Sequence, residues 1–371
     1  MNKKSKKIIK NQKYEDYWKL TLEYSDWKGY KFNTTLSLIV DYIDKYNGII
    51  NSVEYQKMQE ELNKIINKSD MASIRKSINQ FLKLGFINNG MKSYHKKTKS
   101  FLNEKDISRK KRIYSEILYD NASFSRSYKN PTNKKELNFL IKTLEYCGSL
   151  SKDNLLALMY QDVDDYKEGY VDLDTLEVIT NEAISDGSLE RKYNQVQYLY
   201  NICKNVLSGV YLNSNGFLTL DKDEQIEDYI VNKGRDPYKQ RLYKYDLYEE
   251  CKDINDNKIA CYFEDISYPI LIASHIKPYR VCSEDEQFDV DNGLLLSKNI
   301  DQLFDKGWIS FEDDGTVLYS DNLDAKLKKI FKVKPLDKKY LKSKKRLEYL
   351  KYHREYIFDK NKKYNNLYNA Y

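Results

Sequence analysis

Apolar residues recur at helical spacing in three consecutive segments near the start of the chain. The pattern predicts helices over residues 34–47, 52–67 and 71–87, with Asp70 as the N-cap of the third. Polar sequence around an Asn-Asn-Gly turn follows at residues 88–101 and is expected to be extended. Three helices followed by a hairpin-like tail are typical of a winged helix-turn-helix, and an ordinary helical bundle explains the pattern equally well.

A similar order returns in the middle of the chain. Helices are predicted over residues 136–147, 151–159 and 190–207, and two short apolar runs flank Asn-Ser-Asn-Gly at residues 210–220. This last pattern predicts a β-hairpin and favours a second winged-helix-like unit. Residues 107–134, between the two blocks, are polar and are expected to form a linker with a helix inside it.

The last third of the chain follows another order. The apolar run at residues 270–274 predicts a strand that ends at His275, and a second apolar run follows Asn292 and a glycine. Residues 298–305 are predicted to form a short helix that ends at Gly307. Strand, loop, strand and helix, with a histidine at the first strand and an asparagine at the second, are the pattern of a ββα-metal site.

These blocks predict an α+β protein in which two mainly α-helical, winged-helix-like modules precede a ββα-metal domain. The modules are expected at residues 1–125 and 126–225, and the ββα-metal domain at residues 226–371. A chain of 371 residues is long for one hydrophobic core, which agrees with such a division.

Composition narrows the class of protein. No run of 18 apolar residues is present, so no membrane span is expected. Residues 1–13 are basic but lack the apolar core of a secretory signal, so a cytoplasmic location is expected. The five cysteines are scattered without a Cys-x-x-Cys pair, which favours neither a disulfide framework nor a zinc site.

The net charge of +7 is unevenly distributed. Residues 322–371 hold 16 Lys and Arg against 5 Asp and Glu, and residues 1–13 hold six Lys and no acid. Basic ends on an acidic body suit a polyanionic partner such as nucleic acid, although a Lys-rich solubilising surface has the same composition.

The ββα segment contains residue types that suit phosphodiester hydrolysis, which needs a base for the attacking water and a cation for the phosphate. His275 can accept a proton near neutral pH. Asn292 does not titrate, so its amide is expected to bridge the loop and orient His275. Asp301 and Asp305 lie four residues apart, project from one helix face, and are candidate ligands for Mg²⁺.

The other two histidines are weaker candidates. His95 lies in the basic segment SYHKKTKS and is expected to face solvent or phosphate. His353 lies beside Arg354 in the last predicted helix and is expected to pack or to contact phosphate rather than to act in catalysis. His275 is therefore the one candidate base.

The segments SHIKP, NGLLL and LFDKG resemble the HNH endonucleases of bacterial restriction systems. The resemblance covers roughly residues 235–358. It implies that His275 is the general base, that Asn292 is the middle asparagine, and that Asp301 occupies the third position, which is commonly histidine. The chain thus reads H-N-D, which favours Mg²⁺, with Mn²⁺ as a substitute, over softer metals.

Two further positions depart from the family. Ser274 stands where many HNH nucleases have a metal-binding Asp or His, and Tyr279 stands where Trp is usual. Together with Asp301 in place of the third histidine, these departures leave open a catalytically inactive DNA-binding protein with the same fold.

The resemblance implies a metal-dependent endonuclease that cuts double-stranded DNA. We expect a site-specific type II restriction endonuclease, with a cognate DNA methyltransferase in the same cell. A modification-dependent (methyl-directed) restriction nuclease is an alternative. A homodimer is expected because cutting both strands usually requires two active sites.

Because an HNH core mainly grips the DNA backbone, base recognition is expected in the N-terminal modules. Arg75 and Lys76 lie on the polar side of the third predicted helix, which would be the reading helix. Further DNA contacts are expected from Arg241, Lys277 and Arg280 in the ββα-metal domain.

Overall fold

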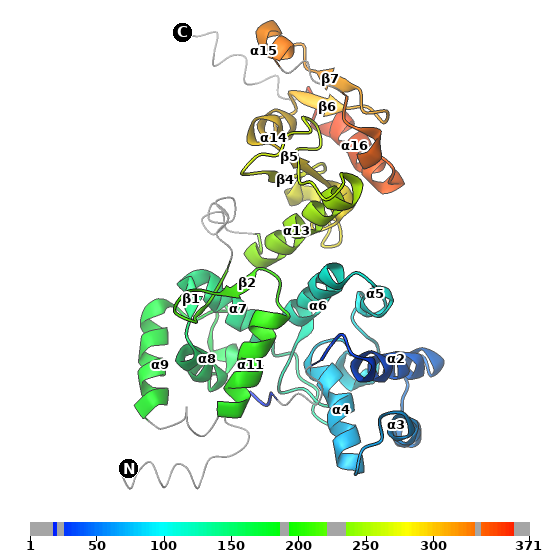
Figure 1. Ribbon diagram of the computed structural model, residues 1–371, viewed down its shortest axis with the longest axis vertical. Coiled ribbons are helices and arrows are strands. Elements are labelled where there is room, and N and C mark those ends of the chain that lie inside the picture. Colours follow the sequence, from blue (N-terminus) through cyan, green and yellow to red (C-terminus); the bar gives the residue numbers. More distant parts are fainter. Residues whose placement is uncertain (1–17, 21–25, 186–192, 221–234, 331–334, 360–371) are drawn as a thin grey trace. The chain divides into compact units, whose positions relative to one another are not determined.

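The computed structural model describes residues 18–20, 26–185, 193–220, 235–330 and 335–359 (Figure 1). Residues 1–13, and residues 331–334 and 360–371 of the basic end at 322–371, lie outside the described residues. Helices and three small antiparallel sheets confirm a mixed α+β protein. Within the described residues, no helix combines the length and apolar character needed to cross a membrane.

The chain separates into two compact units, residues 1–222 and 223–371. The break lies close to the predicted start of the ββα-metal domain at residue 226. A further division of the first unit near residue 125 remains a prediction.

The first unit begins with the three helices that the apolar pattern predicts. Asp70 caps the third of them, as predicted, because its carboxylate accepts the Ser73 amide proton. This helix ends four residues before its predicted end. The chain turns at Gly85, which has a φ of 82° and whose Cβ would lie 2.6 Å from the Asn121 carbonyl carbon. The helices are α2 (Tyr30–Lys45), α3 (Ser52–Ile66) and α4 (Met71–Lys83).

The extended tail expected after α4 is mostly not extended. It contains the 3₁₀ turn η1 (Asn89–Met91), a bridge between Ile87 and Tyr94, and the helix α5 (Thr98–Asn103). The next segment, expected to be a linker with a helix inside it, contains the helix α6 (Ile107–Asn121), which is packed rather than solvated. Sequence polarity misled here because the basic residues of α6 bury their long apolar stems.

The middle of the chain contains the predicted helices and hairpin. The helix predicted over residues 136–147 is α7, with the same bounds, and the hairpin forms at the predicted place. Residues 190–192, at the start of another predicted helix, lie outside the described residues. The elements are α7 (Glu136–Cys147), β1 (Ser149–Leu150), α8 (Lys152–Met159), η2 (Val163–Asp165), α9 (Leu173–Ser185), α11 (Tyr193–Asn205), β2 (Val210–Leu212) and β3 (Leu218–Leu220).

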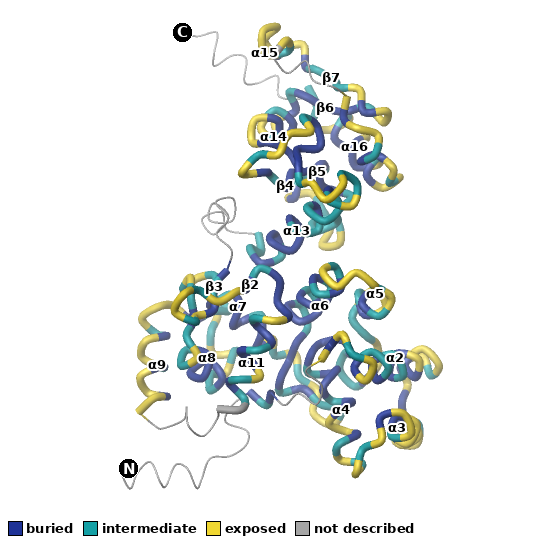
Figure 2. The backbone as a smooth tube through the Cα atoms, in the orientation of Figure 1, coloured by how far each residue is buried: buried dark blue, intermediate teal, exposed yellow. Residues whose placement is uncertain are grey.

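Three elements of this region were not predicted, namely β1, the 3₁₀ turn η2 and α9. The short strand β1 completes an antiparallel sheet of order β1-β3-β2. Most of α9 is exposed, whereas α8 is largely buried (Figure 2). The region is tied to α6, because Ser115 donates to the Val206 carbonyl oxygen at 2.9 Å and accepts the Ser208 amide proton.

The second unit is built around the hairpin β4–β5. Its strands are antiparallel, with Ile272 opposite Leu296 and His275 opposite Gly293. All four residues of β5 are buried, and its three leucines lie in the core of the unit. The elements are α13 (Pro237–Ile254), β4 (Ile272–His275), η3 (Tyr279–Val281), η4 (Val290–Asn292), β5 (Gly293–Leu296), α14 (Lys298–Asp305), β6 (Ile309–Phe311), β7 (Val317–Tyr319), α15 (Ala325–Ile330), η5 (Lys338–Tyr340) and α16 (Lys344–Tyr356).

Candidate active site

The hairpin β4–β5 and the helix α14 form the predicted strand, loop, strand and helix. His275 is the last residue of β4, Asn292 immediately precedes β5, and Asp301 lies in the first turn of α14. The helices α13 and α14 both pack against the hairpin. Local sequence thus places three motif residues on successive elements of one small substructure.

The His275 imidazole is held on several sides. Its Nε2 atom lies 2.8 Å from the Gln287 carbonyl oxygen. Because a carbonyl oxygen only accepts, Nε2 carries the proton and Nδ1 has the lone pair. The ring stacks on Tyr243, with centroids 4.8 Å apart and planes 23° apart, and meets Tyr279 edge-on at 5.6 Å.

Burial lowers the pKa of His275 from 6.5 to about 4. The hydrogen bond to Gln287 and the negative charge of Asp305 oppose this change, whereas the positive charge of Arg235 adds to it. The imidazole is therefore neutral at neutral pH, which is the state that a general base requires.

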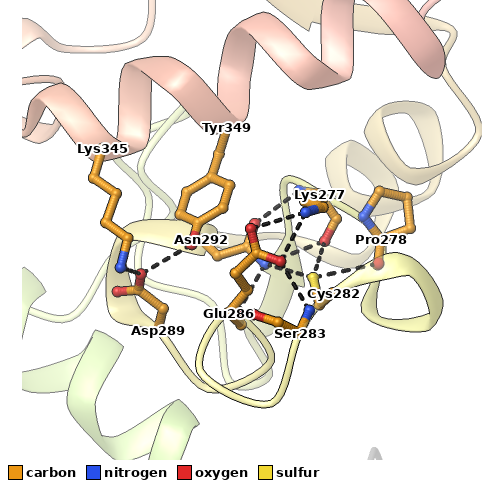
Figure 3. Close-up of polar contacts among 9 residues, drawn as sticks. All are labelled: Lys277, Pro278, Cys282, Ser283, Glu286, Asp289, Asn292, Lys345 and Tyr349. Carbon is orange, nitrogen blue, oxygen red and sulfur yellow. Dashed lines mark hydrogen bonds and ion pairs between the residues drawn. The ribbon is translucent and has the colours of Figure 1, made fainter.

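The Asn292 side chain is fully buried and bridges the loop between β4 and β5 (Figure 3). Its Oδ1 atom accepts the Lys277 amide proton at 2.7 Å. Its Nδ2 group donates to the carbonyl oxygens of Lys277 and Glu286, at 3.2 and 3.1 Å, and to the Cys282 sulfur at 3.2 Å. Both ends of the amide thus act within the protein, as its predicted bridging role requires.

Ion pairs and a tyrosine fasten the same loop (Figure 3). The Lys277 ammonium lies 2.8 and 2.7 Å from the two Glu286 carboxylate oxygens. The Asp289 carboxylate accepts from the Tyr349 hydroxyl at 3.0 Å and pairs with Lys345, both on α16. The loop that carries Asn292 is therefore attached to α16 as well as to itself.

Asp301 is surrounded differently. Burial raises the pKa of its carboxyl group from 3.8 to about 6, the Ser274 hydroxyl opposes this, and the Asp305 charge adds to it. Asp305 itself is exposed and lies 2.9 Å from the Lys306 ammonium. A partly buried carboxylate beside a second carboxylate is a place where a cation is stabilising.

These two carboxylates fit a magnesium ion better than they fit zinc. Mg²⁺ commonly takes one or two carboxylates and completes its shell with water and substrate phosphate. Among the described residues, no group of three or more His, Cys, Asp or Glu side chains is arranged to hold a metal by itself. Asp301 and Asp305 remain the candidate side chains for Mg²⁺, with the remaining ligands supplied by water and the phosphate.

Arg235 is a site residue that sequence reasoning missed. Its guanidinium carbon lies 4.7 Å from the centre of the Tyr279 ring, and its charge lowers the pKa of both His275 and Asp301, in each case after the larger effect of burial. In sequence it is one more basic residue directly before the N-cap of α13. Only the contact between α13 and the hairpin reveals it.

The residues predicted to contact DNA differ in how far they are exposed to solvent. Arg75 and Lys76 are exposed on α4, and Arg280 is exposed after β4. Arg241 is only 7% exposed, so a contact with DNA would require it to leave its buried position. Lys277 would have to exchange Glu286 for a phosphate.

The other histidines are engaged within the protein. His353 is buried, stacks on Phe304 at 3.9 Å, and bonds through Nδ1 to the Ser310 hydroxyl, which agrees with the packing alternative. The expectation that His95 faces solvent or phosphate is wrong. Its ring is 10% exposed and lies 3.6 Å from the Asp120 carboxylate.

Comparison with known families identifies this region. Residues 261–312 match the family model of the HNH endonucleases, and the matched segment includes His275, Asn292 and Asp301. The second unit therefore carries an HNH endonuclease domain, as the sequence resemblance indicated. No curated protein matches the chain.

Proposed function

We propose that this protein is a metal-dependent HNH endonuclease that hydrolyses phosphodiester bonds of double-stranded DNA. The observation that supports this best is that one matched segment carries a neutral His275 at the end of β4 and a partly buried Asp301 carboxylate on α14, the helix that packs against β4. The first is a base in its active protonation state, and the second is a ligand whose charge favours a cation.

In this proposal His275 accepts a proton from the attacking water at Nδ1, while Nε2 remains bonded to Gln287. Asn292 keeps the loop closed around that contact. Asp301 and Asp305 would hold Mg²⁺, or Mn²⁺ as a substitute, which supplies positive charge to the phosphate when bound. Arg235 would bind a non-bridging phosphate oxygen through the edge of its guanidinium while its face remains on Tyr279.

We further propose a site-specific type II restriction endonuclease in which the first unit reads the sequence. Residues 26–121 contain 18 Lys and Arg against 11 Asp and Glu, whereas residues 134–220 contain 8 against 13. Positive charge favours binding to phosphate. The earlier region, which exposes Arg75 and Lys76 on α4, is therefore the better candidate for the region that recognises the DNA sequence.

The winged-helix interpretation is part of this proposal. In the middle region, a helix, a short strand, further helices and a hairpin follow one another, and the sheet order is β1-β3-β2. This order supports a winged-helix-like module there. The earlier region has the three helices but a bridge and α5 in place of a full hairpin.

A homodimer, a cognate DNA methyltransferase and a cytoplasmic location are expected under this proposal. Two other functions remain open, a modification-dependent restriction nuclease and a catalytically inactive DNA-binding protein. The Ser274 and Asp301 departures from the family pattern are what favour the inactive alternative.

A cleavage assay separates the three functions. The full-length protein is incubated with methylated and unmethylated plasmid DNA in Mg²⁺, with a chelator as the control and DNA binding measured in parallel. Discrete fragments from unmethylated DNA alone support the type II enzyme, and fragments from methylated DNA alone support the modification-dependent enzyme. Binding without cleavage of either DNA would contradict a nuclease.

A further inference from the structure

Tyr243 joins the first two motif residues of the HNH domain. It lies on α13 and is 1% exposed. Its ring stacks on the His275 imidazole, with centroids 4.8 Å apart. Its hydroxyl donates to the Asn292 carbonyl oxygen at 3.2 Å. One side chain from outside the ββα motif thus contacts both the candidate base and the residue that closes the loop.

The hairpin approaches this tyrosine so closely that only glycine fits opposite His275. A Cβ atom on Gly293 would lie 2.4 Å from the Tyr243 hydroxyl oxygen and 2.8 Å from a Leu247 methyl carbon. The backbone of Gly293 is extended, with a φ of −123°, so any residue could adopt its conformation. Gly293 is therefore needed for space against α13 rather than for a turn.

The Asn292 carbonyl oxygen is contacted by two hydrogen-bond donors. It accepts the Ile276 amide proton at 3.0 Å, directly after His275. The Tyr243 hydroxyl approaches the same oxygen. Burial raises the pKa of this hydroxyl well above 10, so it stays protonated and donates throughout the working pH range.

We propose that Tyr243 is a positioning residue for His275. Its ring fixes the plane of the imidazole, so that Nε2 stays on the Gln287 carbonyl oxygen and Nδ1 stays the nitrogen with the lone pair. Tyr279 limits the ring from another direction by its edge-on contact. The inference rests on the proposed function of His275 as the base, and it adds a requirement from α13 that the motif itself does not contain.

The stack also keeps water away from the imidazole. Arg235 and Asp305 are the charged groups that act on His275, with opposite effects on its pKa. Removing the Tyr243 ring would leave these charges in place while exposing the imidazole to water. Two consequences are then expected, a ring that rotates between orientations and a protonation that occurs at higher pH.

Tyr243→Leu tests this in the full-length protein, with Tyr245→Leu as the matched control. Tyr245 is a half-buried tyrosine on the same helix that packs against Tyr248. In Tyr243→Leu we expect kcat to fall by about 10- to 100-fold, a part of what a general base contributes. KM and DNA affinity are expected to stay within about twofold, because no contact with DNA is removed.

Histidine-labelled protein gives a second readout that does not depend on cleavage. The chain has three histidines, so His275 can be assigned from the spectrum of His275→Ala. In metal-free Tyr243→Leu, the pKa of His275 is expected to rise from about 4 toward 6.5. It is expected to stay low in Tyr245→Leu. An unchanged titration and an unchanged kcat in a folded Tyr243→Leu protein would overturn the inference.

Tyr243→Phe keeps the test decisive if the leucine variant does not fold. It retains the ring and loses only the hydroxyl, so kcat is expected to stay within about tenfold of wild type. A loss of more than about 100-fold, as large as for a lost base, would show that the hydroxyl and not the ring is what matters. If no form of the protein cuts DNA, the proposed function fails, and the histidine titration still decides the role of Tyr243.

Discussion

Asn292 and Asp301 belong to the same HNH domain, yet their surroundings are opposite. The Asn292 amide makes four hydrogen bonds inside the loop. The Asp301 carboxylate has a pKa raised by burial and by its neighbour Asp305. The difference indicates that the loop is complete within the protein alone, whereas a proton or a cation would stabilise the Asp301 carboxylate on α14. The structural role of Asn292 and the proposed metal-binding role of Asp301 are thus assigned to different elements of the domain.

The largest effect is expected at Asp301. Asp301→Asn should reduce cleavage to background at millimolar Mg²⁺, because a neutral amide cannot attract an ion that gives up its water reluctantly. Asp301→His should keep some activity and shift the preference toward softer metals. Full cleavage by Asp301→Asn would contradict its role as a ligand.

The same variant should stabilise the metal-free protein. The pKa of Asp301 is higher in the folded chain than in the unfolded chain, so its ionisation opposes folding as the pH rises from about 4 to 6. At pH 7.5, Asp301→Asn should therefore raise the free energy of unfolding by about 1–3 kcal/mol. Denaturant unfolding in the presence of a chelator measures this change. A clear destabilisation would contradict the claim that the ionised Asp301 carboxylate opposes folding in the metal-free protein.

His275→Ala should slow cleavage by about 10²- to 10⁴-fold while DNA binding is nearly unchanged, because the base is lost and no phosphate contact is. His95→Ala is the matched control, since this histidine pairs with Asp120 in the other unit. Single-turnover rates measure the effect. More than about a hundredth of the wild-type rate in His275→Ala would contradict its assignment as the base.

Asn292→Ala should act in the opposite direction to Asp301→Asn on stability. Four hydrogen bonds are lost in a fully buried place, which should cost about 2–4 kcal/mol and loosen the loop next to His275. Cleavage should fall with it, by about 10- to 100-fold. Asn322→Ala, which removes an exposed asparagine from the same unit, should change neither. If Asn292→Ala is as stable as the wild type, the claim that the Asn292 hydrogen bonds stabilise the loop is contradicted.

The smallest expected effect is a change in pH dependence with metal concentration. A proton and a metal ion compete for the Asp301 carboxylate, whose pKa is about 6, whereas His275 stays unprotonated down to about pH 4. At low Mg²⁺, cleavage should fall as the pH drops below about 6. Raising Mg²⁺ should move this acid limb to lower pH. An acid limb that ignores Mg²⁺ would mean that Asp301 does not bind the ion.

The motif residues could be predicted from the sequence because they are local. His275, Asn292 and Asp301 lie on successive elements, and the periodicity of each run shows where the strand or helix begins. The partners that set their chemistry could not. Tyr243 and Arg235 come from α13, and their positions depend on packing between segments that are distant in sequence.

The same reason explains the errors elsewhere. The basic run in α6 predicts a polar linker with a helix inside it, because sequence shows charge but not the burial of its apolar stems. Lys277 is predicted from the sequence to contact DNA, but in the structure its ammonium pairs with Glu286. The sequence does not show that Gly293 is needed for space against α13. These errors concern contacts that the sequence does not show, whereas the tail after α4 was also wrong in its local conformation.

The most direct test of the central claim is a crystal structure of the full-length protein soaked in Mn²⁺, with the ion located by its anomalous signal. The account predicts one ion at the end of β4, about 2.0–2.2 Å from a carboxylate oxygen of Asp301, with Asp305 near enough to share it directly or through water. It also predicts that the four hydrogen bonds of Asn292 are unchanged. An ion bound without Asp301, or an Asn292 amide that turns to meet the ion, would contradict the account.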